Sequence, residues 1–177
     1  MQRYWYELVF EVIDMRSFSN LWYWIALAVV WSTTSHWVLG VPYDMVLRAR
    51  RHGGQAQQDL EDMVRITTNR LLYILKMTGP VLLAFTCFVL AALGVMAFYY
   101  DVEIAQALFL LAFPMSIVGG LSFYTASQIS HEMIRGEALQ KKLASHRIVT
   151  QGIGMLSIFV TAMYGMYQNM SLGALGQ

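Results

Sequence analysis

The sequence of 177 residues is poor in charge and in cysteine. Only 13% of its residues are charged, whereas hydrophobic residues make up 57%. A composition with so little polar material excludes an ordinary soluble globular domain. The single cysteine, Cys87, excludes an intramolecular disulfide, and we expect it to be a small residue of the core. The net charge of +1 gives no electrostatic reason to expect nucleic-acid binding.

Motifs for catalysis and ion-coupled transport are missing as well. The chain has no GxSxG, no P-loop and no pair of carboxylates within an apolar run. His131-Glu132 lacks the second histidine of the HExxH zinc motif. Ion-coupled transporters usually keep an acidic or basic side chain within their spans, and no apolar run here contains one. We therefore expect a protein that is not an enzyme, with no catalytic residue, no cofactor and no metal site.

Four long apolar runs are the most informative feature of the chain. They cover residues 20–41, 77–100, 104–126 and 148–167. Each has about 20 residues or more, which suffices for a helix that rises ~1.5 Å per residue to cross ~30 Å of hydrocarbon. The first run lacks a basic leader and a small-residue cleavage pattern, so we expect it to remain as a helix. The pattern predicts an all-α fold, an integral membrane four-helix bundle that forms a single domain over residues 1–177.

The distribution of lysine and arginine predicts the orientation in the membrane. Ten of the twelve fall in two loops, residues 42–76 and 127–147. The short turn at 101–103 and the chain after residue 167 contain none. Because cationic loops are retained in the cytoplasm, both loops are predicted to be cytoplasmic and both termini periplasmic.

The basic loops are predicted to be largely helical. Pro42 should open a short helix that Gly53-Gly54 ends, and a second amphipathic helix should run from Gln57 straight into the second span. Gly79-Pro80 is expected to bend that helix, and the third span should continue past the membrane to a turn near Gly136. These loops either contact anionic lipid headgroups or dock a soluble partner. Their candidate interaction residues are Arg48, Arg50 and Arg51.

The first residues predict an amphipathic helix, over 3–17, that lies on the membrane surface. Trp5 belongs to its apolar face, whereas Glu7 and Glu11 lie on the opposite face. Interfacial helices that bind anionic lipid are rich in Lys and Arg, so this acidic helix is either an anchor or a contact with a neighbouring protein. Ser19 or Asn20 should cap the span that follows. The aromatic belt at the start of that span comprises Trp22 and Trp24.

Histidines are the candidates for a cofactor site, because neutral imidazole suits a metal, a haem or a quinone headgroup. The predicted topology places all four on the cytoplasmic side, and the candidates that we consider are His36, His131 and His146. Their spacing matches no metal-ligand pattern. His36 is the deepest and follows a polar run, Ser32–Ser35, whose hydroxyls should bond back to their own backbone carbonyls. We expect His36 to face the bundle interior or a partner.

Small residues in the third and fourth runs predict surfaces for close helix approach, because small side chains let backbones come near each other in membranes. The residues concerned are Ser116, Gly119, Gly120, Gly152, Gly154 and Gly165. Ser116 and Gly120 are the candidates for contacts with another subunit.

Two stretches near the N-terminus carry a resemblance to a known family. They are IDMRSFSNLWYWIALAV at 13–29 and SHWVLGVPYDMV at 35–46. Together with the rest of residues 5–54, they resemble small uncharacterised alphaproteobacterial inner-membrane proteins, some of which carry the automatic label "component of SufBCD complex". The label implies iron–sulfur assembly, but a single cysteine cannot hold a cluster. The resemblance implies a bacterial inner-membrane location, and no site residues follow from it.

Three functions fit these observations. The first is a non-catalytic accessory, assembly or scaffolding subunit of a respiratory or photosynthetic type of inner-membrane complex. Its partners would be the lipid bilayer and other integral membrane subunits. The second is a haem-, metal- or quinone-binding membrane protein that uses His36. The third is a homo-oligomer that forms a passive pathway for a small solute or lipid.

Overall fold

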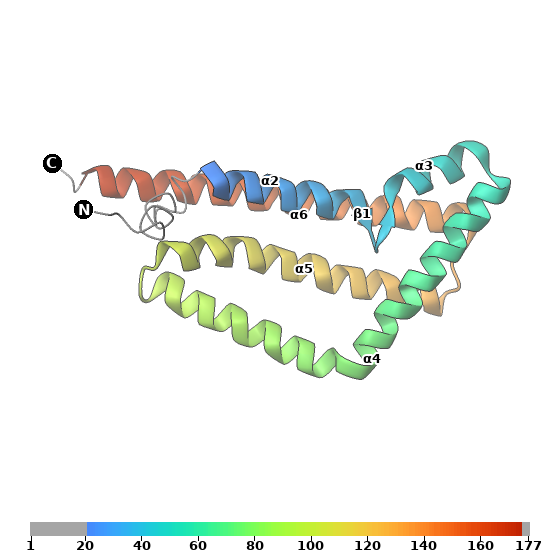
Figure 1. Cartoon of the computed structure of the whole chain (residues 1–177), viewed down its shortest axis with the longest axis horizontal. Helices are drawn as coiled ribbons and strands as arrows, with labels where there is room; N and C mark the ends of the chain where they lie inside the picture. The colour runs from blue at the N-terminus through green and yellow to red at the C-terminus, as the bar shows by residue number, and fades with distance from the viewer. Residues whose placement is uncertain (1–20, 175–177) are drawn as a thin grey trace, which may run out of the picture.

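The computed structural model describes residues 21–174, so the predicted helix at 3–17 and its residues Trp5, Glu7 and Glu11 lie outside the described part, as do the caps Ser19 and Asn20. The described chain forms five helices and one two-stranded sheet (Figure 1). In chain order the elements are α2 (Leu21–His36), β1 (Trp37–Val38), β2 (Val41–Pro42), α3 (Tyr43–His52), α4 (Gly54–Phe98), α5 (Glu103–His131) and α6 (Gly136–Ala174). The all-α prediction is confirmed for this part of the chain.

Three of the described helices are long and apolar enough to cross a membrane: α4, α5 and residues Gly136–Gln168 of α6. These three correspond to the second, third and fourth apolar runs. The described part of α2 has 16 residues, which at ~1.5 Å per residue is about 24 Å and short of ~30 Å of hydrocarbon. A fourth crossing therefore stays a prediction.

The prediction that residues 37–41 continue the first helix is wrong. α2 ends at His36, and β1 pairs antiparallel with β2, Trp37 opposite Pro42 and Val38 opposite Val41. Leu39 and Gly40 form the turn, both with positive φ (54° and 75°), as a tight two-residue hairpin requires. Val38, Leu39 and Val41 are buried. The turn thus packs three apolar side chains into a core that they would not reach from a straight helix.

The helices predicted for the basic loops are present, although the second begins at Gly54 and not at Gln57. α3 begins directly after Pro42 and ends at Gly53, whose φ of 57° suits glycine. α4 begins at Gly54 and runs without interruption into the second apolar run. α5 continues to His131, and the chain returns at Gly136, which also has a positive φ.

α4 consists of two limbs that meet at a sharp bend (Figure 1). Pro80 lies inside the helix. Proline lacks the backbone N–H that the helix needs and its ring collides with the carbonyl four residues earlier, so we attribute the bend to Pro80, as predicted.

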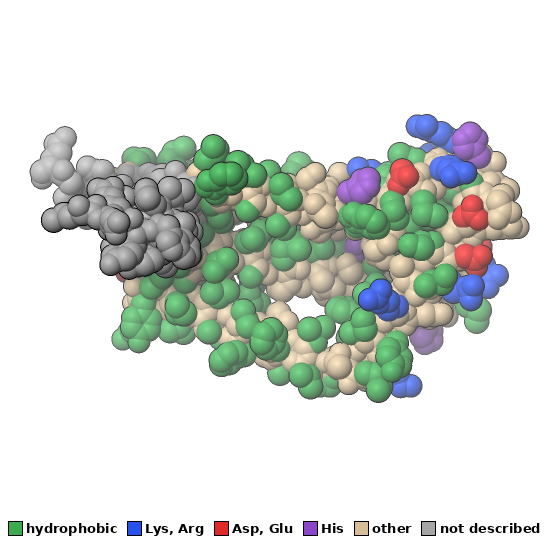
Figure 2. All heavy atoms as spheres, in the orientation of Figure 1, with side chains coloured by type: hydrophobic (Ala, Val, Ile, Leu, Met, Phe, Trp, Pro, Cys, Tyr) green, Lys and Arg blue, Asp and Glu red, His purple; other side chains and the backbone are tan. Residues whose placement is uncertain are grey.

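The helices pack as an open array. α5 packs against α4 on one side and α6 on the other, and α2 lies along α6 (Figure 1). Figure 2 shows open gaps through the molecule between α5 and the second limb of α4. The prediction of a four-helix bundle is met only in part, because α4 does not close the array against α2.

The larger of two apolar cores lies at the end of the molecule where the charged side chains gather (Figure 2). We call residues 43–76 and 127–147 the charged cap. Its buried core joins the hairpin, α3, the first limb of α4, the end of α5 and the start of α6. The core residues are Val38, Leu39, Val41, Val46, Ala49, Leu60, Val64, Ala126, Ile129, Leu139 and Leu143. The charged cap is therefore packed around a buried core that it shares with the hairpin and is not a set of loose loops.

The smaller core lies between the apolar helices. Leu27 and Trp31 of α2 pack with Val118 of α5, and Ile153 of α6 packs against them. Cys87 is not part of either core: it is exposed on α4, and the prediction of a core position is wrong. Apolar character alone does not separate interior from lipid-facing positions, because hydrocarbon tails accept both.

Candidate functional site

The structure does not gather the three candidate histidines into one site. His36 is exposed at the end of α2, where its ring meets that of Trp37 edge-on with 6.0 Å between centroids. His131 is exposed at the end of α5. His146 is buried, with 6% of its surface exposed. Of the two alternatives for His36, the interior of this chain is wrong, because the hairpin after it turns Val38, Leu39 and Val41 inward instead, and contact with a partner stays a prediction.

His146 is fixed by a partner on the neighbouring helix. Its Nδ1 lies 3.1 Å from Oγ1 of Thr125 on α5, and both residues are buried. A buried imidazole needs such a partner, because an unpaired polar group in an apolar interior costs about 1–3 kcal/mol. The hydrogen bond joins α5 to α6 just where both helices enter the charged cap.

His146 lines a pocket of about 440 Å³ that is open to the outside of the described chain. α2, the hairpin, α4, α5 and α6 all contribute to its lining. The lining residues are Thr34, Trp37, Leu39, Gly40, Thr67, Arg70, Leu71, Ile74, Val118, Ser122, His146 and Thr150. A pocket of this size, with an apolar wall and a few polar groups, is typical of a small-ligand site. We call it the central cavity.

Thr150 also contributes to the lining of the central cavity. Its Oγ1 is buried and has no hydrogen-bond partner among the described residues. Most of the other hydroxyls near the cavity are satisfied: Thr34 donates to the carbonyl of Val30 and Thr67 to that of Met63. The predicted back-bonding in the polar run of α2 is thereby confirmed for Thr34, and Ser35 likewise donates to Ser32. The remaining polar side chains of the lining are His146 and Arg70, which offer hydrogen bonds and, from Arg70, a positive charge.

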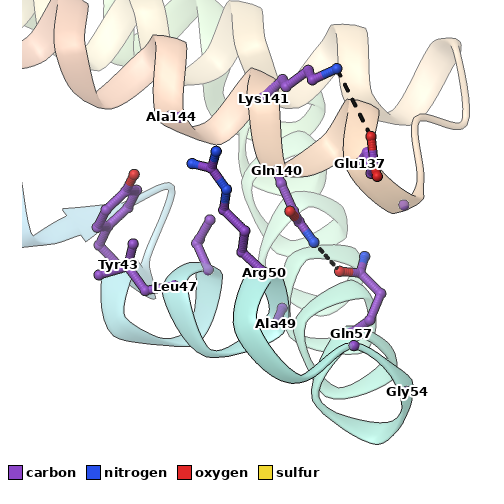
Figure 3. Close-up of a pocket in the computed structure, with 13 residues that line it drawn as sticks. Tyr43, Leu47, Ala49, Arg50, Gly54, Gln57, Glu137, Gln140, Lys141 and Ala144 are labelled. Atoms are coloured by element: carbon purple, nitrogen blue, oxygen red, sulfur yellow. Dashed lines mark hydrogen bonds and ion pairs between the residues drawn. The ribbon is translucent and has the colours of Figure 1, made fainter.

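A second concave site, the basic cleft, lies between α3 and α6 in the charged cap (Figure 3). Its volume is about 570 Å³. Gln140 on α6 donates to Gln57 on α4 over 2.6 Å and closes one end. Figure 3 shows Arg50 reaching from α3 towards α6 near Ala144. Of the three candidate interaction arginines, which are all exposed, only Arg50 lines this cleft.

Glu61 links the two predicted cytoplasmic loops beside the basic cleft. Its Oε1 accepts hydrogen bonds from Nε2 of Gln57 over 2.7 Å and from the backbone N–H of Gly136 over 2.9 Å. The hydrogen bond from Gln57, followed by that from Gly136, lowers the pKa of Glu61. From the sequence, Glu61 is expected only to complement the dipole at the start of its helix. The spacing of Gln57 and Glu61 was visible as a helical pair, but the contact with Gly136, 75 positions later, was not.

The remaining predicted interaction residues divide between exposed and packed positions. Trp22 is 68% exposed, whereas Trp24 packs against the smaller core. Ser116 donates to the carbonyl of Phe113 in its own helix. A side chain added at Gly120 would meet no atom within 4 Å. Within the described chain Gly120 therefore makes no close helix contact, and the same holds for Gly119 and Gly152.

Two further searches, for a metal site and for related proteins, give no assignment of function. Within residues 21–174, no group of three or more His, Cys, Asp or Glu side chains is placed to hold a metal ion. Comparison of the chain with protein-family models, with curated proteins and with solved structures finds no match in any of the three. The class that the fold defines is an α-helical membrane-embedded protein, and function rests on the sites themselves.

Proposed function

We propose that this protein is a non-catalytic accessory, assembly or scaffolding subunit of a bacterial inner-membrane complex of the respiratory or photosynthetic type. The observation that carries the proposal is the exposure of α4. Only 6% of the residues in its most apolar 18-residue stretch are buried, against 28% for α5 and for α6. A span that packed as an equal member of a closed bundle would bury one face, so α4 is the helix most suited to contact another subunit.

The side chains of this limb suit a helix–helix contact. Val81, Leu83, Phe85 and Phe88 are all more than 60% exposed. Van der Waals packing drives helix association in lipid, and such large apolar side chains supply it. In the proposed topology α2 and the hairpin complete a fourth crossing, the charged cap lies in the cytoplasm and both termini are periplasmic.

Position 87 allows a direct test, because the side chain of Cys87 is exposed on α4. The photo-reactive amino acid p-benzoylphenylalanine, incorporated in place of Cys87, should on illumination of native membranes cross-link one foreign membrane subunit in a fixed ratio. Mass spectrometry of the product names that subunit, and gentle-detergent purification should recover the same protein. The Cys87→Ala variant, which lacks the photo-reactive group, is the control for cross-links formed elsewhere.

The cross-link also separates the proposal from a homo-oligomer. A product made only of two copies of this chain would contradict the accessory role and support self-assembly around α4. Protein that cross-links to lipid alone would show that α4 faces the bilayer, and the accessory role would then lose its supporting observation.

A second candidate function has its own observation, the central cavity with His146 and Arg70. Its occupant would be a membrane-soluble molecule with a hydrogen-bonding headgroup, such as a quinone, and its anchor would be His146 in place of His36. Organic extraction of the purified protein with mass spectrometry, together with an optical spectrum for haem, tests this. A bound species that His146→Leu removes and His36→Leu retains would support it, and an empty extract from native membranes would contradict it.

A further inference from the structure

The basic cleft lies where two predicted spans leave the membrane. Tyr43 forms part of its wall two residues after the first apolar run ends, and Ala144 lies four residues before the fourth run begins. The other end of the cleft, at Gly54 and Gly136, lies farther along both helices. The cleft thus runs outward from the level at which lipid headgroups sit.

Cations dominate the cleft. Arg50 and Lys141 line it against one carboxylate, Glu137. Lys141 and Glu137 are 4.0 Å apart, and both are more than 80% exposed, so this pair is worth little and leaves Lys141 available. No ion pair of Arg50 occurs within the described residues. The N-terminus of α6 at Gly136 already donates its N–H to the carboxylate of Glu61, so the positive charge of the cleft comes from the two side chains.

Arg147 reinforces the wall at the membrane end. Its guanidinium carbon lies 3.9 Å from the ring centroid of Tyr43, and its Nε is buried without a hydrogen-bond partner among the described residues. The stacking holds Tyr43 in place. Arg147 itself does not line the cleft and acts on it only through Tyr43.

We propose that this cleft binds the phosphate of an anionic phospholipid, with Arg50 and Lys141 as its ligands. Arginine and lysine are the side chains that bind phosphate in proteins. The membrane end adds an apolar wall, Leu47 and Ala144, against which the upper part of an acyl chain packs. A free phosphate ion would use the cations but not this wall. The site goes beyond the accessory role and does not depend on it.

The experiment measures the thermal unfolding midpoint of the full chain in an uncharged detergent at constant ionic strength. Three additives are titrated separately: dioleoylphosphatidylglycerol, dioleoylphosphatidylcholine and sodium phosphate. A ligand that binds only the folded state raises the midpoint in a saturable manner. We expect phosphatidylglycerol to do so at concentrations where phosphatidylcholine has little effect, because choline neutralises the phosphate charge.

The chain offers a matched pair of charge variants. Arg50→Gln/Lys141→Gln removes the two proposed ligands, and we expect it to raise the half-maximal phosphatidylglycerol concentration about tenfold or more. Arg51→Gln/Lys142→Gln removes equal charge one residue further along the same helices, outside the cleft lining. This control should change the value by less than about twofold.

Three results would overturn the proposal. Equal losses in the two double variants would mean diffuse attraction to a basic surface. Equal stabilisation by both lipids would mean that the anionic phosphate is not recognised. Sodium phosphate as effective as phosphatidylglycerol would make the ligand a free anion and not a lipid.

A second variant keeps the proposal testable if the charge variant does not fold. Ala144→Trp fills the cleft and keeps every charge, so it should also abolish the response to phosphatidylglycerol. A full response in Ala144→Trp protein with unchanged helical circular dichroism would place the lipid elsewhere.

Discussion

Gly154 of α6 lies directly against the indole of Trp31 on α2. A Cβ atom at Gly154 would lie 2.7 Å from Cε3 of Trp31 and 3.1 Å from Cδ2. Trp31 is 5% exposed, so its ring has little room to move. This contact is the close helix approach that small residues predict, and it fixes α2 to α6 at the centre of the smaller core.

Gly154→Ala should therefore destabilise the fold. The added methyl group forces the indole or the helix axis to shift, and overpacking of this kind costs about 1–3 kcal/mol. Thermal unfolding in detergent, followed by circular dichroism, measures the loss. Gly152→Ala is the matched control on the same helix, because its Cβ would meet no atom within 4 Å. Equal midpoints for the two variants would show that α2 does not pack on α6 as described.

Glu61→Gln should loosen the charged cap. A lowered folded-state pKa means that the ionised carboxylate is the bound form, so Glu61 stabilises the fold fully above its unfolded pKa and this contribution is lost as the pH falls through the lower, folded value. We expect Glu61→Gln to lower the free energy of unfolding by about 1 kcal/mol at neutral pH. Hydrogen bonds to charged groups are worth more than neutral ones, but the partial exposure of Glu61 to solvent reduces their contribution.

The pH dependence distinguishes Glu61 from an ordinary surface charge. The stability gap between wild type and Glu61→Gln should shrink as the pH is lowered from 7 to about 3. Asp62→Asn is the control, because within residues 21–174 Asp62 pairs only with exposed Arg65 in the next turn. A gap for Glu61→Gln no larger than that for Asp62→Asn, or one that grows in acid, would contradict the link to Gly136.

Thr125→Val should destabilise the junction of α5 with α6. Valine keeps the shape of threonine but leaves Nδ1 of His146 buried without its partner, which costs about 1–3 kcal/mol. Thr78→Val is the control, since its hydroxyl is exposed and bonds only to the carbonyl of Ile74 in its own helix. Unfolding midpoints of both variants give the comparison.

A double-mutant cycle tests whether the cost comes from the hydrogen bond itself. In a His146→Leu background no imidazole is left unsatisfied, so Thr125→Val should cost clearly less there than in the wild-type chain. An undiminished cost would mean that Thr125 acts through packing alone and that His146 has another partner.

The local course of the chain could be predicted from sequence because its signals are local. Pro42 and Gly53 bound α3, Gly136 marks the return into α6, and Pro80 accounts for the bend of α4. Each acts through its own backbone dihedral angles or its missing N–H, which neighbouring elements do not change. The apolar runs likewise predict long helices by length and composition alone.

Which side chains point into the protein and which point outward could not be predicted from the sequence in the same way. His36 and His146 both lie at the edge of an apolar run, yet only His146 is buried. Gly120 and Gly154 are equally small, yet only Gly154 meets a neighbouring helix. Cys87 sits mid-run but faces outward. In a membrane protein both the interior and the lipid accept apolar residues, so the hydrophobic pattern that reveals the inner face of a soluble helix is weak here.

The sequence by itself determined the helical class, the apolar lengths and the gathering of charge at one end, because these depend on composition and on residues that act on their own backbone. Only the tertiary structure decided which histidine lines the central cavity, which glycine receives Trp31 and which arginine enters the basic cleft. Those choices depend on the rotation of each helix about its axis. That rotation is set by contacts between residues far apart in the chain, such as Glu61 with Gly136 and Thr125 with His146.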